Sequence, residues 1–336
     1  MTTKSAGGPL LSQDEIGLLI SSAGTAPSMH NTQPWRFEIN GPVVDVILDE
    51  ARGLPAADRS GRLILIGLGA ATFNLRVAAA SLGYETTFAT EPDPDRPDIV
   101  TRVFLGSRRS PTPSLAALYG ELRRRHTYRG PMMDLDVPLR VRDRMAAAAR
   151  SEGGDLRWLD AAGRRQLGGI LRVADDLDLH DEDRLTERQQ WVGGERDVEG
   201  VPADALGPLP IGPATVRDLS AGFERPGRGV AAFEQQPLIG ILTTPGDRPS
   251  EWLRAGMALQ HALLAATSYD LAVSFLNQAV EYIHLRSRVQ ELVGQGARPQ
   301  VILRVGYPAR ASAGTPRRSW DRTVIQGRPL EAPRAR

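Results

Sequence analysis

An internal repeat is the feature that most constrains how this chain of 336 residues can fold. At a constant offset of 187 positions, small and apolar residues of the first half coincide with identical residues of the second half without a gap. The repeat predicts two copies of one unit, each with a helix, a strand and a later strand. A further pair of segments, 99–106 and 299–306, ends in a glycine in both copies. The residues matched at the constant offset are Gly69, Ala71, Ala78, Ala79, Ser81 and Phe88 with Gly256, Ala258, Ala265, Ala266, Ser268 and Phe275.

The hydrophobic pattern predicts the elements of each copy. Residues 62–80 are apolar on almost every face, which is typical of a helix buried on most sides. Alternating segments on either side of Gly41 and Pro42 predict a hairpin. The other predicted strands are 84–89, 99–105, 237–244 and 271–275, and the other predicted helices are 13–23, 138–150, 161–176 and 252–267.

The composition narrows the classes of function. A formal charge of +1 gives no basic field for nucleic acid or for a membrane surface, so neither is an expected partner. The absence of cysteine excludes disulfides and redox chemistry on protein thiols, so any redox function needs a bound cofactor. The polar N-terminus has no signal-peptide pattern, and we expect a cytoplasmic protein.

Residues 26–37 combine polar side chains with two prolines just before a predicted strand. Ser28, Asn31 and Gln33 can donate or accept hydrogen bonds, and Pro27 and Pro34 stiffen the backbone between them. By itself this pattern is also compatible with an ordinary polar turn in which Ser28 caps a helix.

The order Pro-Ser-x-x-Asn-x-Gln-Pro-Trp in this stretch resembles the flavin-contacting loop of the nitroreductase family. The resemblance implies an α+β fold in which FMN binds between two subunits. Combined with the repeat, it implies two tandem nitroreductase-like repeats that form a pseudo-dimer within one chain, with mixed or antiparallel sheets flanked by helices. The residues that it places at the flavin are Pro27, Ser28, Met29, Asn31 and Gln33.

A basic cluster at residues 123–129 follows a predicted short helix. Arginines at a helix C-terminus can simply complement the helix dipole and remain solvated. The order Arg-His-Thr-x-Arg, however, resembles the motif with which nitroreductases hold the FMN phosphate and ribityl chain. The resemblance assigns this role to Arg125, Thr127 and Arg129, with His126 contacting the flavin through its backbone.

Two later segments resemble the family less closely. The loop after the predicted strand 271–275 lies where nitroreductases approach the flavin ring with backbone groups, which implicates Asn277 and Gln278. Near the C-terminus, family members place basic residues that complete the phosphate site, which implicates Arg318 and, secondarily, Arg317. The alternative for Arg317 and Arg318 is a charged tail.

Each of the two flavin motifs occurs once, so the resemblance implies one FMN per chain and a monomeric pseudo-dimer. This fused pattern is similar to the Acg-type branch of the family. We expect the first repeat to span 1–117 and the second to span 118–336.

Residues 187–233 are rich in glycine, proline and charge but carry several apolar side chains. Long irregular stretches inside compact units are usually functional or disordered. We expect the 187–233 segment to be an ordered lid over the flavin ring, with Trp191 or Phe223 buried beneath it.

The leading functional hypothesis is an oxidoreductase in which FMN takes hydride from NAD(P)H and passes electrons to an unidentified small-molecule acceptor. A second hypothesis is an FMN store whose lid closes the ring to substrates, and a third is a flavin-dependent dehydrogenase of natural-product biosynthesis. No catalytic side chain and no metal site are predicted, because the histidines show no ligand spacing or nucleophile motif. His261, on a predicted buried helix, is expected to be a core residue.

Overall fold

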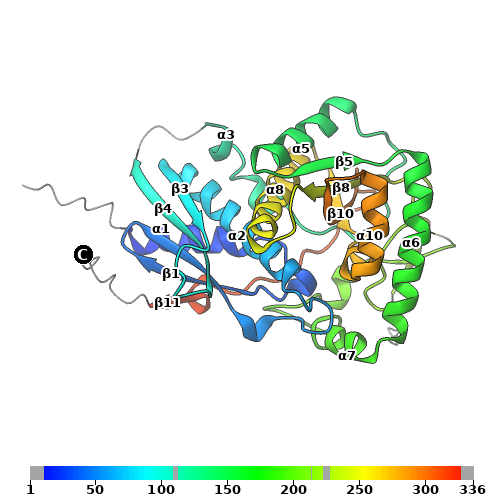
Figure 1. Ribbon diagram of the computed structural model, residues 1–336, viewed down its shortest axis with the longest axis horizontal. Helices are drawn as coiled ribbons and strands as arrows, with labels where there is room; N and C mark the ends of the chain where they lie inside the picture. Colours follow the sequence, from blue (N-terminus) through cyan, green and yellow to red (C-terminus); the bar gives the residue numbers. More distant parts are fainter. Residues whose placement is uncertain (1–10, 109–112, 213, 222–227, 327–336) are drawn as a thin grey trace, which may run out of the picture.

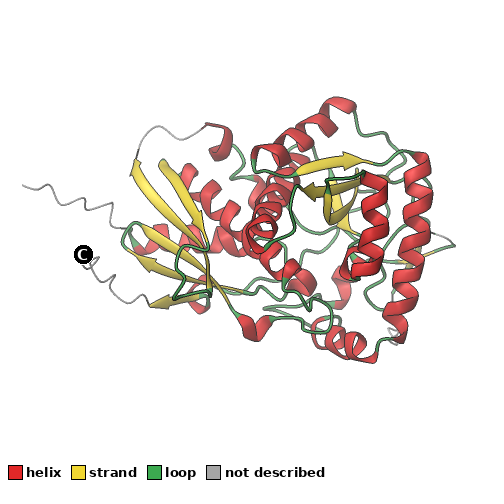
Figure 2. Ribbon diagram, viewed as in Figure 1, coloured by secondary structure: helices red, strands yellow, loops and turns green. Residues whose placement is uncertain are grey.

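The computed structural model describes residues 11–108, 113–212, 214–221 and 228–326. Within them, two large sheets stand on either side of a pair of central helices, and a third sheet has only two short strands, β6 (Leu209–Pro210) and β7 (Val230–Ala231) (Figures 1 and 2). The predicted α+β class, with largely antiparallel sheets and flanking helices, is confirmed.

The first sheet has the strand order β11-β1-β2-β4-β3. Its strands β1 and β2 form the predicted hairpin, and only the pairing of β1 with β11 is parallel. Helix α1 begins with a capping box in which Ser12 and Glu15 satisfy each other's backbone groups. The bounds are α1 (Gln13–Gly24), β1 (Trp35–Asn40), β2 (Val43–Leu48), α2 (Arg62–Ser81), β3 (Tyr84–Thr90), β4 (Ile99–Arg108) and β11 (Val324–Gln326).

The second sheet has the order β5-β8-β10-β9 and is antiparallel throughout. Position by position this is the order β1-β2-β4-β3 of the first sheet, and α5 and α8 take the places of α1 and α2 in the chain. The two halves therefore share one topology, as the repeat predicts. The bounds are α5 (Leu139–Ser151), β5 (Asp155–Trp158), β8 (Leu238–Thr244), α8 (Pro249–Thr267), β9 (Ala272–Phe275) and β10 (Arg298–Gly306).

Helices α2 and α8 pack against each other at two glycines. A Cβ added to Gly69 would lie 2.0 Å from the carbonyl oxygen of Leu253, and one added to Gly256 would lie 2.0 Å from that of Ile66. Neither position has room for a side chain, so the two matched glycines permit the close approach of the helices. Helix α2 is also the one described helix long and apolar enough to cross a membrane, but most of it is buried, as in a core helix.

The second half carries insertions that the first half lacks. Helices α6 and α7 and most of the 187–233 segment lie between β5 and β8, and two further helices lie between β9 and β10. The remaining elements are α3 (Pro113–Ala116), α4 (Glu121–Arg124), α6 (Ala161–His180), α7 (Glu182–Trp191), β6 (Leu209–Pro210), β7 (Val230–Ala231), α9 (Gln278–Glu281) and α10 (Ile283–Val293).

The structure corrects the expected start of the irregular segment. Residues 187–191 form the end of α7, so the irregular part begins after Trp191. It still contains a 3-10 turn at 203–206 and the two short strands β6 and β7, which pair with each other. Trp191 packs on Val192, Val201 and Leu206 in a small apolar cluster of the segment itself. Phe223 lies outside the described residues.

The chain crosses back to the first half at its end. After β10 it passes the loop 26–33 and adds β11 to the first sheet, where Phe37 pairs with Val324. The expected division between residues 117 and 118 stays a prediction. Strand β11 belongs by sequence to the second predicted repeat but pairs with the sheet of the first.

Candidate functional site

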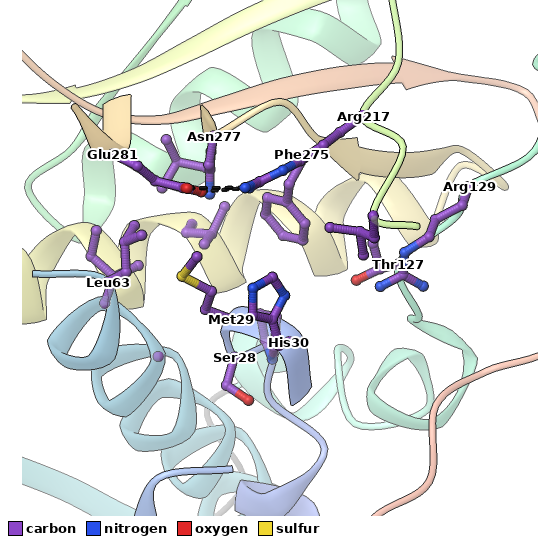
Figure 3. Close-up of a pocket in the computed structure, with 16 residues that line it drawn as sticks. Ser28, Met29, His30, Leu63, Thr127, Arg129, Arg217, Phe275, Asn277 and Glu281 are labelled. Carbon is purple, nitrogen blue, oxygen red and sulfur yellow. Dashed lines mark hydrogen bonds and ion pairs between the residues drawn. The ribbon is translucent and has the colours of Figure 1, made fainter. Parts of the chain in front are cut away.

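A cavity of about 700 Å³, including its opening, lies where the two halves meet. Figure 3 shows Ser28, Met29 and His30 on one side of it and Phe275, Asn277 and Glu281 on the other. Its walls are mostly apolar, with polar groups at a few places, which is typical of a site for a flat organic ligand. The lining residues are Pro27, Ser28, Met29, His30, Leu63, Ile66, Gly67, Thr127, Arg129, Arg217, Leu219, Leu259, Phe275, Asn277, Glu281 and Val301.

The loop beside the cavity has an unusual backbone. His30, Asn31 and Gln33 have φ angles of 50°, 58° and 52°, in the left-handed region that side chains other than glycine rarely adopt. The Ser28 hydroxyl accepts a hydrogen bond from the Gln33 amide at 2.9 Å and closes the turn. Strained positions of this kind persist where neighbouring structure fixes them, and they concentrate at ligand sites.

The amide side chains of Asn31 and Gln33 bond to other segments of the chain. Asn31 donates to the carbonyl oxygens of Gly200 at 2.9 Å and Pro316 at 3.0 Å. Gln33 donates to the carbonyl oxygen of Val198 at 2.9 Å. Both residues therefore tie the loop to the 187–233 segment, and neither is among the residues that line the cavity.

Arg125, Arg129 and Arg317 form a cationic cluster that reaches the cavity through Arg129. Arg125 is buried, and Arg129 and Arg317 are half-buried. Burial and the neighbouring Arg317 lower the pKa of Arg125 to about 9 and that of Arg129 to about 10, and burial lowers the pKa of Arg317 to about 10. Among the described residues no carboxylate pairs with them; their partners are carbonyl oxygens, the Asn31 amide oxygen and the Thr315 hydroxyl. Cations that are shielded from water without a counter-ion are costly, so this cluster can accommodate an anionic ligand.

The cluster brings together segments that are far apart in the chain. Arg125 and Arg317 donate to the same carbonyl oxygen, that of Thr25, at 2.7 and 3.3 Å. Arg129 donates to the carbonyl oxygen of Ala205 at 3.1 Å and lines the cavity together with Thr127. The predicted motif at 125–129 and Arg317 thus lie together.

His126, Gln278 and Arg318 are oriented away from the cavity. The His126 ring lies 2.9 Å from the Ser312 hydroxyl, and Gln278 donates to Asp175 on α6 at 3.1 Å. Arg318 donates to the carbonyl oxygens of Gln33 and Arg322. Of the two C-terminal candidates, Arg317 joins the cationic cluster and Arg318 does not.

A buried ionic network lies at the wall of the cavity. Arg217, from the 187–233 segment, bonds both oxygens of Glu281 at 2.5 and 3.0 Å and also lies 3.2 Å from Asp178. Arg184 bonds both of these carboxylates, and Arg188 bonds Asp178. Burial and these nearby guanidinium groups hold the pKa of His30 well below its usual range, so its ring is neutral at neutral pH.

The sequence did not single out several of these residues. Arg217 and Leu219 lie between β6 and β7, outside any helix or strand, and nothing in their spacing points to a cavity. Leu63, Ile66 and Leu259 look like ordinary core positions of two helices. Only Phe275 carried a signal, as a member of the repeat.

Fold and site together define an α+β protein built from two copies of one unit, with a largely apolar cavity next to a cluster of arginines. The chain is 32% identical over 319 residues to "Putative NAD(P)H nitroreductase Rv3131" of Mycobacterium tuberculosis, which covers 93% of this chain and 91% of that protein. It is 28% identical over 322 residues to "Putative NAD(P)H nitroreductase acg" of the same species, over 93% and 96% of the two chains. The chain therefore belongs to the NAD(P)H nitroreductase family, as the motif at 26–37 predicts.

Similarity to solved structures is weaker. A nitroreductase with bound FMN from Bacteroides fragilis has a TM-score of 0.38 and 12% identity, over 65% of this chain and 97% of that one. An iodotyrosine deiodinase bound to FMN and 3-iodo-L-tyrosine has a TM-score of 0.39 and 15% identity, over 60% and 94%. No family model matches the chain.

Proposed function

We propose that the protein is an FMN-dependent oxidoreductase that takes hydride from NAD(P)H and delivers electrons to a small-molecule acceptor. The observation that carries the proposal is the cluster of Arg125, Arg129 and Arg317 beside an apolar cavity. Arg125 is buried, Arg129 and Arg317 are half-buried, and none of the three pairs with a carboxylate among the described residues. A phosphate dianion matches forked guanidinium donors, and an apolar slot matches a flavin ring. The printed names of the relatives agree with NAD(P)H as the donor.

In this proposal the cationic cluster holds the FMN phosphate, and the ring lies between Met29 on one side and Phe275 on the other. Bound FMN would supply the hydride chemistry, and no side chain needs to act as a nucleophile. The protein's contribution is to bind, to orient and to exclude water. The strained loop 28–33 fixes the backbone on the Met29 side of the cavity, and Asn277 is held by accepting a hydrogen bond from the Ile302 amide at 3.0 Å.

We propose one FMN per chain. Leu259 and Val301 line the cavity, and in the first copy their counterparts are Thr72 and Thr101. Those two hydroxyls are fully buried and lie 2.7 Å from each other. The equivalent position in the other half is therefore filled by packed side chains, which supports a single site and a monomeric pseudo-dimer.

The test is a visible absorption spectrum of the purified protein, with flavin identity and content measured after denaturation. We expect a flavin spectrum, released FMN close to one equivalent per chain, and bleaching on addition of NAD(P)H. Two equivalents would contradict the single site, and failure to bind FMN on reconstitution would contradict the proposal as a whole.

A second candidate function is FMN storage, and one observation favours it. Arg217 attaches the 187–233 segment to the body of the protein through a buried ion pair at the cavity wall. A segment held in this way would restrict access to the ring. Rapid reduction by NAD(P)H distinguishes the enzyme from the store, because storage requires no turnover.

A further inference from the structure

A buried chain of hydrogen bonds runs from the central helices to the cationic cluster. Gln260 on α8 donates to the amide oxygen of Asn74 on α2 at 2.7 Å, and Asn74 donates to the Thr25 hydroxyl at 3.0 Å. That hydroxyl donates in turn to the carbonyl oxygen of Ser22 at 2.7 Å. Asn74 and Gln260 are both fully buried, so water cannot replace these bonds.

The chain of bonds ends where the anion site begins. Thr25 is the residue that follows α1, and its carbonyl oxygen is the acceptor shared by Arg125 and Arg317. The two guanidinium groups repel each other, as the lowered pKa of Arg125 reflects. A carbonyl at a helix C-terminus carries partial negative charge and can hold two cations close together. Arg317 uses its Nη1 group for Asn31, Thr315 and Pro316. The Nε–H groups of both arginines have no partner among the described residues and remain for a ligand.

The other copy of the repeat has no such chain. At the offset of 187, Asn74 corresponds to His261 and Gln260 corresponds to Phe73. These two counterparts stack as rings, with centroids 4.8 Å apart. The His261 ring then meets the Ser151 hydroxyl at the exposed end of α5, the counterpart of α1, at 3.1 Å. The pair Asn74 and Gln260 and the pair His261 and Phe73 occupy equivalent positions in the two copies. Only the pair of amides, Asn74 and Gln260, leads to the cationic cluster.

We propose that Thr25, Asn74 and Gln260 are positioning residues for the anion site, which set Arg125 and Arg317 at the spacing that a phosphate group needs. The inference rests on the proposed function only in taking FMN as the anionic ligand. The three residues act through the Thr25 carbonyl and touch no ligand themselves. They should therefore govern the phosphate part of the affinity and leave the ring part unchanged.

The test compares FMN with riboflavin, which has the same ring but no phosphate. Dissociation constants for both are measured by flavin fluorescence on the full chain after removal of bound flavin. Thr25→Val removes the hydroxyl, and the double variant Asn74→Leu/Gln260→Met removes both amides together, so that neither is left unpaired. Thr25→Ser should restore wild-type behaviour. The matched control is Thr72→Val. Thr72 is a threonine of α2 whose buried hydroxyl also forms hydrogen bonds, but its partners are Thr101 and the Leu68 carbonyl oxygen.

We expect Thr25→Val and the double variant to weaken FMN about tenfold and riboflavin less than about twofold, while Thr72→Val leaves the ratio of the two constants unchanged. If the variants weaken FMN and riboflavin equally, the residues are merely structural. If the variants weaken neither ligand, the inference is also overturned. If Thr25→Val does not fold, the double variant decides. A wild-type protein that binds FMN no better than riboflavin would instead refute the phosphate site of the proposed function, and this inference with it.

Discussion

Arg217 and Glu281 form a buried, bidentate ion pair between the 187–233 segment and α9, with N–O distances of 2.5 and 3.0 Å. The Glu281 side chain is completely inaccessible to solvent. Arg184 also bonds both Glu281 and Asp178, and Arg188 bonds Asp178, so loss of Arg217 would leave two guanidinium groups facing these carboxylates. Both carboxylates would keep a cationic partner, whereas the 187–233 segment would lose this attachment.

We therefore predict that Arg217→Met speeds the reduction of bound FMN by NAD(P)H roughly tenfold or more, since a buried charged hydrogen bond contributes about 1.5–3 kcal/mol. FMN content should not change, because Arg217 bonds none of the three arginines proposed to hold the phosphate. Stopped-flow absorbance measures the rate. Arg228→Met is the control, because Arg228 pairs with Asp218 inside the same segment.

The result also separates the two candidate functions. If the wild-type protein is already reduced rapidly and Arg217→Met is no faster, the 187–233 segment is structural and the storage function loses its support. A slow wild-type protein that Arg217→Met accelerates would favour a segment that gates access to the ring.

The cationic cluster gives the second prediction. Arg125→Ala and Arg129→Ala should each weaken FMN binding by about 1.5–3 kcal/mol, because each removes a charged hydrogen-bond donor from a buried site. Arg123→Ala should have little effect, because Arg123 is exposed at the end of α4. Isothermal titration of the flavin-free protein measures all three. Equal FMN affinity in the three variants would show that the arginines at 123–129 do not hold FMN and are better interpreted as a solvated helix end.

The third prediction concerns the contact that holds the two halves together. Gly69→Ala and Gly256→Ala would each place a methyl group 2.0 Å from a backbone oxygen of the facing helix, so the helices must separate. We expect a loss of about 3 kcal/mol or more, since overpacking of backbone against backbone cannot be relieved by rotating a side chain. Gly120→Ala is the control: a Cβ there meets nothing within 4 Å, and φ is −60°. Thermal unfolding that is equal in all three variants would show that the helices do not need this contact.

The sequence predicted the parts of the molecule that depend on pattern. The offset of 187 located both central helices, and residues 26–37 located the loop beside the cavity. It could not predict directions of side chains that tertiary contacts decide. Arg317 and Arg318 are neighbours, yet one faces Arg125 and the other faces the carbonyl oxygen of Arg322.

The ionic network illustrates the same limit. Arg217 and Glu281 are 64 positions apart in the sequence, and no local sequence pattern predicts their pairing. The left-handed backbone at His30 and Asn31 could not be predicted from the sequence either, because residues other than glycine adopt this conformation only where the surrounding fold imposes it.

The last prediction follows from Asp175, the partner of Gln278 on α6. Burial raises the pKa of Asp175 to about 6, although Arg217 and the Gln278 hydrogen bond oppose the shift. Between the unfolded value near 3.9 and about 6, the folded protein binds the proton more tightly than the unfolded chain does. The charge of Asp175 therefore costs stability above pH 6, and the cost disappears below about pH 4.

Asp175→Asn keeps an oxygen that can accept the bond from Gln278 and removes the charge. We expect it to raise the free energy of unfolding at pH 7 by roughly 1–2 kcal/mol, a value reduced from the full shift because Asp175 is partly exposed. The gain should vanish in urea titrations at pH 4. Asp176→Asn, one residue along α6 on its exposed face, should change stability little at either pH. A gain for Asp175→Asn that is the same at pH 4 and pH 7 would show that the effect does not come from ionisation.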